Sequence, residues 1–265
     1  MTTDESPTRL LGRYSESDLM GMFADAGVIA AVNKRGFSDL EFQFDSGEGP
    51  LTHARLHGSR EGHRHLLLDA CLSEVRLDTT NSQRCGYGGS LPVDLVVIYW
   101  LREQDPTASF DRRHPRLPLQ EHPGLGVLKR AFQVALTMAR ELGHDGIAAL
   151  PKFFHDASIF WHSRLFLFLD PGEQGRFEAL TRDLAELSLA DASLALAAGA
   201  VRNRDGHPVS WHSGFQVMPL DSPLTEWFHS APWQESCRRE ADTQRYTVDQ
   251  AALDAARIVF AQDGR

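Results

Sequence analysis

Two glycines ahead of a helical stretch are the residues whose types and spacing point most directly to chemistry. Gly124 and Gly126 open an amphipathic segment that reaches Gly143. Glycine lets the backbone approach a ligand closely, and the free N–H groups of a first helical turn attract an anion at the positive end of the helix dipole. The sequence therefore predicts an anion-binding turn over residues 124–127. A Pro-Gly turn that only caps an ordinary helix is the alternative.

Three titratable residues are candidates for moving a proton. Glu74 and Glu103 stand at the ends of two predicted strands, and His155 begins a predicted helix. A carboxylate or an imidazole in such a place can act as a general base or acid. The alternative for each glutamate is a solvated carboxylate at the end of a strand. Asp156, next to His155, is expected to cap its helix.

The histidines and cysteines do not form a convincing metal site. His63 and His65 share one face of a predicted strand, and His155 and His162 share one face of a predicted helix. No acidic residue or cysteine accompanies either pair at a matching interval. The cysteines are far apart, and none belongs to a CxxC pair: Cys71, Cys85 and Cys237. We therefore predict neither a bound metal nor a disulfide framework.

The elements that would position these residues follow from hydrophobic periodicity. Ser15 and Asp18 resemble a capping box, and the apolar spacing after them predicts a helix that ends near Gly36. Alternating or continuous apolar residues then predict strands over 39–45, 51–57, 64–77 and 93–102. A polar, glycine-rich loop is expected at 78–92. Next come a helix from about Gly124 to Gly143, a short strand and a short helix.

The part of the chain beyond residue 170 has a different composition. Alanine- and leucine-rich stretches there predict mostly helices, with one strand-like segment over 207–220. Taken together, the order of elements predicts an α+β protein with a central mixed sheet flanked by helices. We divide it into a domain of residues 1–170 and a mostly helical extension of residues 171–265 packed on that domain.

The order helix, meander, central strand, glycine turn, helix, strand and helix resembles the GCN5-related N-acetyltransferase (GNAT) superfamily. The resemblance is clearest over residues 93–170. Gly124-Leu125-Gly126 is similar to the glycines of the family's Gln/Arg-x-x-Gly-x-Gly/Ala turn. Ala157, followed by Phe160-Trp161, looks like the positions of an alanine and a tyrosine on the family's later helix.

The resemblance implies an enzyme that transfers an acetyl or other acyl group from acyl-coenzyme A to an amine. It implies that the backbone amides of Gly124, Leu125, Gly126 and Val127, with Gln120 nearby, hold the diphosphate of the coenzyme. Glu74, Glu103 and His155 would then be the candidates for removing the ammonium proton of a small-molecule or peptide amine. Whether the protein forms a homodimer remains an open question at this point.

Three residues depart from the family pattern and keep other functions open. Glu121 falls at the Gln/Arg position, Pro123 lacks a backbone donor, and Trp161 stands at the tyrosine position, where an indole N–H is too weak an acid to protonate a thiolate. A catalytically inactive binding or scaffold protein of the same fold is the second hypothesis. A third is a transferase with another acyl donor, such as an aminoacyl-tRNA, bound by Arg112, Arg113 and Arg116.

Composition and charge exclude several classes of protein. The net charge is −9, with 36 acidic residues against 27 lysines and arginines, which argues against DNA binding. No apolar run approaches the roughly 20 residues that span a bilayer, and the N-terminal residues hold no apolar signal core. We therefore expect a cytoplasmic protein that binds no membrane. The apolar content of 42% is enough for a full hydrophobic core.

Overall fold

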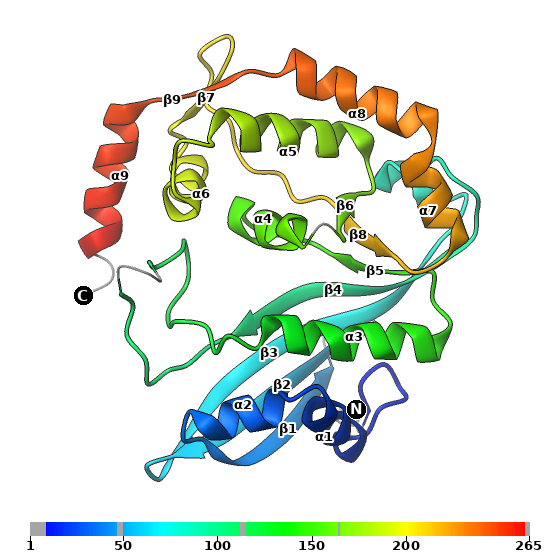
Figure 1. The fold of residues 1–265 in the computed structure, drawn as a ribbon, viewed down its shortest axis with the longest axis vertical. Coiled ribbons are helices and arrows are strands. Elements are labelled where there is room, and N and C mark those ends of the chain that lie inside the picture. Colours follow the sequence, from blue (N-terminus) through cyan, green and yellow to red (C-terminus); the bar gives the residue numbers. More distant parts are fainter. Residues whose placement is uncertain (1–8, 47–49, 112–114, 164, 263–265) are drawn as a thin grey trace, which may run out of the picture. The chain divides into compact units, whose positions relative to one another are not determined.

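The computed structural model describes residues 9–46, 50–111, 115–163 and 165–262. The protein is α+β, as the sequence predicts, with helices flanking a mostly antiparallel sheet (Figure 1). The chain forms two compact units, each built from separated stretches of sequence. The first comprises the described residues of 1–76, 93–114 and 121–149; the second comprises those of 77–92, 115–120 and 150–265. The division at residue 170 stays a prediction about domains.

The first unit opens with two short helices where the sequence predicts one. α1, Glu16–Asp25, begins with the predicted capping box, in which Ser15 and Asp18 bond each other's backbone N–H groups. α2 covers Val28–Lys34. Gly27 separates the helices because its backbone is left-handed, with φ of 73°. A left-handed residue cannot continue a right-handed helix, so the chain turns here.

Three antiparallel strands follow as a meander. β1 is Ser38–Ser46, β2 is Thr52–Arg60 and β3 is His63–Leu77, which confirms the predicted strands. Their register places Phe44 opposite Ala54, and Ala54 opposite Ala70. Alternate residues are buried along β2, as expected for strands with one face on a core.

The central strand and the helix after it complete the first unit. β4 is Val93–Glu103, α3 is Leu128–Leu142 and β5 is Gly146–Ala149. β4 and β5 pair in parallel from Leu95–Gly146 to Ile98–Ala149, and β4 then continues beyond the end of β5. The helix was predicted to begin near Gly124, but it begins four residues later, so residues 124–127 form the turn ahead of it. Gly143 ends the helix in the left-handed conformation, as predicted.

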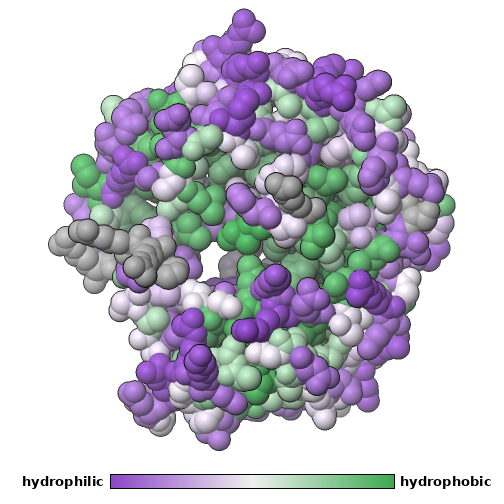
Figure 2. Space-filling view, viewed as in Figure 1, coloured by the Kyte–Doolittle hydropathy of each residue, from purple (hydrophilic) through white to green (hydrophobic). Residues whose placement is uncertain are grey.

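The second unit contains most of the helices. Its elements are η1 (Ser82–Cys85), α4 (Phe154–His162), β6 (Leu167–Phe168), α5 (Pro171–Asp183), α6 (Leu189–Ala197), β7 (Val201–Asn203), β8 (Gln216–Pro219), α7 (Ser222–His229), α8 (Ala231–Thr243), β9 (Tyr246–Val248) and α9 (Gln250–Gln262). Its core gathers around Phe177, whose ring lies 5.5–5.7 Å from the rings of Phe154, Trp161 and Phe168. α5 and α8 pack closely, because Gly175 faces the carbonyl oxygen of Cys237. Figure 2 shows hydrophilic side chains along the outer surface where α8 runs.

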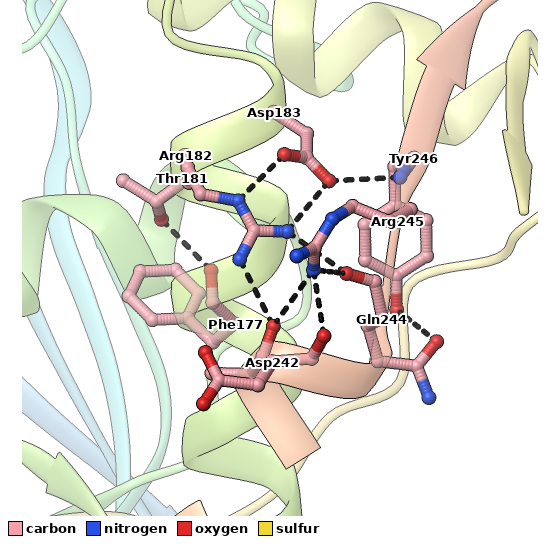
Figure 3. A network of polar contacts seen from close by, with 9 residues as sticks. Phe177, Thr181, Arg182, Asp183, Asp242, Gln244, Arg245 and Tyr246 are labelled. Carbon is pink, nitrogen blue, oxygen red and sulfur yellow. Dashed lines mark hydrogen bonds and ion pairs between the residues drawn. The ribbon is translucent and has the colours of Figure 1, made fainter. Parts of the chain in front are cut away.

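An arginine–aspartate pair fixes the chain where α8 ends and β9 begins (Figure 3). Arg182 forms two hydrogen bonds with the Asp183 carboxylate and donates to the carbonyl oxygens of Ala241 and Gln244. Asp183 also accepts the backbone N–H of Tyr246 at 2.8 Å. The guanidinium therefore satisfies carbonyl groups at the end of a helix, which have no partner within the helix itself.

The predicted loop at 78–92 is packed within the second unit. It contains η1 and the buried Tyr87, whose hydroxyl donates to the carbonyl oxygens of Ser90 and Pro223. The ring of Tyr87 meets that of Trp227 edge to face at 5.6 Å. The buried Tyr87 therefore anchors the predicted loop against Trp227 of α7.

Candidate functional site: the turn before α3

The predicted anion-binding turn of residues 124–127 directly precedes α3 in the first unit and is separated from the end of β4 by residues 104–123. The side chains of Leu125 and Val127 are buried, whereas Gly126 between them is exposed and left-handed, with φ of 73°. The two apolar side chains anchor the turn in the core. The glycine then reverses the backbone so that consecutive N–H groups point to one place, an arrangement that binds anions.

That place already holds an anion from the chain itself. The Glu103 carboxylate, at the end of β4, accepts the N–H of Gly126 at 3.2 Å and the N–H of Val127 at 3.1 Å. A Cβ atom on Gly124 would stand 2.8 Å from Oε1 of Glu103, so a glycine is needed for the carboxylate to come this close. The turn thus binds a carboxylate in the way the sequence predicts it to bind a phosphate.

Burial and hydrogen bonding shift the pKa of the Glu103 carboxyl group in opposite directions. Burial raises the pKa of Glu103 above its ordinary value. The N–H groups of Val127 and Gly126 and the charge of Arg35 lower the pKa, but they do not outweigh burial. The turn therefore holds a carboxylate whose charged form is less favourable than in water.

Arg35 supplies the positive charge at this site. It follows α2, its Nη1 lies 2.9 Å from Oδ2 of Asp105, and a Cβ atom on Gly126 would stand 3.7 Å from its Nη2. Asp105 is nearly buried, and its backbone N–H donates to the carbonyl oxygen of Pro123 at 2.7 Å. Burial raises the pKa of Asp105, but hydrogen bonds from Thr107 and Arg35 outweigh that effect and lower it overall. Sequence reasoning missed Arg35 because no spacing links it to a turn about ninety residues later.

The two predicted glutamates do not lie together. Oε2 of Glu74 is 2.9 Å from Nε2 of His144, directly after the C-terminal end of α3. Glu103 contacts the N-terminal end of the same helix. A helix rises 1.5 Å per residue, so the 15 residues of α3 separate the glutamates by about 20 Å. One site cannot use both carboxylates.

The other predicted site residues belong to the second unit. Gln120 forms a local turn, in which its side-chain oxygen accepts the N–H of Leu117 and its carbonyl accepts a hydrogen bond from Arg116. The Arg116 guanidinium also stacks on Phe260. Arg112 and Arg113, named with it as a basic patch, lie outside the described residues.

His155 is buried in a polar cluster. Its Nδ1 lies 2.7 Å from Oγ of Ser193 on α6, and its Nε2 lies 3.3 Å from Oδ1 of Asp156. Burial lowers the pKa of His155, and the Asp156 charge opposes this shift without reversing it. Asp156 also accepts the backbone N–H of Phe153, which confirms its predicted capping role. The exposed fractions of Ser193 and His155 are 2% and 6%, so the imidazole and the hydroxyl are buried, whereas the Asp156 side chain is partly exposed.

Within the described part of the chain, no three histidine, cysteine or acidic side chains are grouped closely enough to hold a metal ion. None of the described helices is long and apolar enough to cross a bilayer.

Comparison with known proteins adds no relative, because no family model, no curated protein sequence and no solved structure matches the chain.

Proposed function

We propose that this chain is a cytoplasmic N-acyltransferase of GNAT-like fold that uses acyl-coenzyme A as donor and an amine as acceptor. One observation carries the proposal. The N–H groups of Gly126 and Val127 converge on a carboxylate before α3, which supports this turn as the place where the coenzyme's diphosphate binds. The parallel pair of β4 and β5, with α3 between them in sequence, supports the same proposal.

The proposed binding mode requires an exchange of anions. The diphosphate replaces the Glu103 carboxylate at the amides of Gly126 and Val127, and Arg35 beside the turn contributes positive charge. Burial already disfavours the charged form of Glu103, which lowers the cost of releasing it. The thioester then lies along β4 beyond the end of β5, where a backbone N–H polarises its carbonyl group. The unprotonated amine attacks that carbonyl carbon and the carbon–sulfur bond breaks. The proton that the amine nitrogen loses ends on the sulfur, so the coenzyme leaves as a thiol.

Two glycines at opposite ends of α3 offer a matched test. Gly126 and Gly143 have φ of 73° and 72°, so a valine imposes similar backbone strain at either position. Calorimetric titration with acetyl-coenzyme A should show binding to the wild type and to Gly143→Val. Gly126→Val should weaken it at least about tenfold, equivalent to about 1.4 kcal/mol. Equal binding by both variants would refute the turn as the coenzyme site.

The second candidate is a catalytically inactive binding protein with the same fold. Trp161 favours it, since the resemblance expects a proton-donating tyrosine at this position, and the indole packs edge to face on Phe177 in the core. In this case Glu103 is a permanent cap of α3. Release of coenzyme A thiol in the presence of a panel of amines separates the candidates, because the inactive protein releases none above the uncatalysed rate.

A further inference from the structure

Four alanines face one another in the core of the first unit. Ala54 on β2 and Ala70 on β3 are direct cross-strand partners. Ala131 and Ala135 lie one turn apart on α3. All four line one cavity of about 50 Å³ between the sheet and the helix. Small side chains on both layers leave a space that the larger residues common in cores would fill.

The walls of this cavity are entirely apolar. Every lining residue is an alanine, leucine, isoleucine, valine, phenylalanine or methionine. On one side, the rings of Phe23 and Phe42 meet edge to face at 5.0 Å and brace each other. A water molecule inside would have no side-chain hydrogen-bond partner, although the volume is large enough for one. Such a space stays dry and favours an apolar occupant.

The lining also reaches partly exposed residues. Leu101, near the end of β4, and Phe132, on the second turn of α3, both line the cavity and are both half-buried. Rotation of either side chain would connect the space to the surface of the unit. Exchange of a small ligand therefore does not require the unit to unfold.

We propose that this cavity is a binding site for a small, uncharged hydrocarbon group. Its volume is below the roughly 150 Å³ of a cavity that admits benzene, so the ligand is a short alkyl group or another apolar group of a few atoms. The site is distinct from the turn before α3 and does not depend on acyl-coenzyme A binding. It recognises its ligand by shape and the absence of polar atoms alone.

Xenon is a suitable probe, because it is apolar and small. Methyl resonances of the full chain are recorded under increasing xenon pressure. The cavity methyls of Leu68 and Val134 should shift in a saturable way, while those of Leu196, in the core of the second unit, should not. Wild-type cavity methyls that shift no more than those of Leu196 would overturn the proposal.

Variants that fill the cavity provide a second test of the proposal. Ala70→Val adds two methyl groups from a strand, where a branched side chain is favourable, and should reduce the xenon response at least about tenfold. Ala54→Val fills the space from the partner strand and serves if the first variant does not fold. Ala255→Val, on the exposed face of α9, is the matched control and should keep the full response. A folded cavity variant that also keeps it would refute the assignment.

Discussion

Replacing Glu103 by alanine or by glutamine separates the two effects that the turn exerts on this side chain. Alanine removes the acceptor of the Gly126 and Val127 N–H groups. Hydrogen bonds to charged groups contribute about 1.5–3 kcal/mol each, but Gly126 is exposed, and water can replace its partner. We therefore expect Glu103→Ala to lower the free energy of unfolding by about 1–3 kcal/mol. The melting temperature should fall by about 2–4 °C for each kcal/mol.

Glutamine keeps an acceptor oxygen and mimics the protonated acid. Because burial raises the pKa of Glu103 in the folded chain, the folded state binds more protons than the unfolded state above the ordinary glutamate pKa. The stability that Glu103 contributes is therefore fully present below that ordinary pKa. It is lost as the pH rises through the raised value. Glu103→Gln lacks this dependence, so its free energy of unfolding should increase relative to that of the wild type as the pH rises.

Urea unfolding followed by circular dichroism from pH 4.5 to pH 8 measures both variants against the wild type. The difference in free energy of unfolding between Glu103→Gln and the wild type should change in favour of the variant across this range and then become constant. A difference that stays constant, or that moves in favour of the wild type, would refute the reasoning. It would mean that the amides of the turn stabilise the carboxylate at least as much as burial destabilises it.

Other perturbations test the packing and the polar clusters of the second unit. Gly175→Ala places a Cβ atom 2.3 Å from the Cys237 carbonyl oxygen, so it should lower the free energy of unfolding, measured by urea titration, by about 1–3 kcal/mol. The control is Gly21→Ala, in α1 with open space around it, which should be neutral or stabilising. Arg182→Ala should cost about 1–3 kcal/mol by the same measurement, since it removes the ion pair with Asp183 and one of the two arginine donors, Arg182 and Arg245, to the carbonyl oxygens of Ala241 and Gln244. A change within error would show that Arg245 and water replace the guanidinium. Burial lowers the pKa of His155, so the stability that this residue contributes is present above the ordinary histidine pKa and is lost as the pH falls through the lowered value. His155→Gln should therefore flatten the pH dependence of the melting temperature. An unchanged slope would contradict the neutral, buried state of that imidazole.

Sequence patterns were sufficient to predict β1 to β5 and the capping box at the start of α1, but not the short strands β6, β7 and β9. Alternation along 39–45 and the apolar run over 93–102 place buried residues on defined faces, and a wrong register would expose them. The break at Gly27 was missed because a glycine inside a helical pattern signals lower helix propensity but not its backbone angle. Similarly, Ser230 caps α8 and separates it from α7, a boundary that the helical composition of this region does not mark.

The candidate site was predictable in place but not in detail. The spacing of Gly124 and Gly126 located the turn, whereas the Glu103 carboxylate inside it depends on how β4 and α3 meet in space. Arg35 and the partnership of His155 with Ser193 also join residues far apart in sequence. Tertiary contacts of this kind have no local signature in one sequence. The compact units are likewise assembled from separated stretches, which no shift in composition marked.

The most direct test of the proposed function is calorimetric titration of wild type and Glu103→Ala with acetyl-coenzyme A. If the diphosphate and the carboxylate compete for the same N–H groups, removal of the carboxylate should tighten binding at least about tenfold over the wild type, or about 1.4 kcal/mol. The same protein with Gly126→Val added should lose that gain. A folded Glu103→Ala protein that binds no acetyl-coenzyme A, or binds it no better than the wild type, would contradict a coenzyme site at this turn.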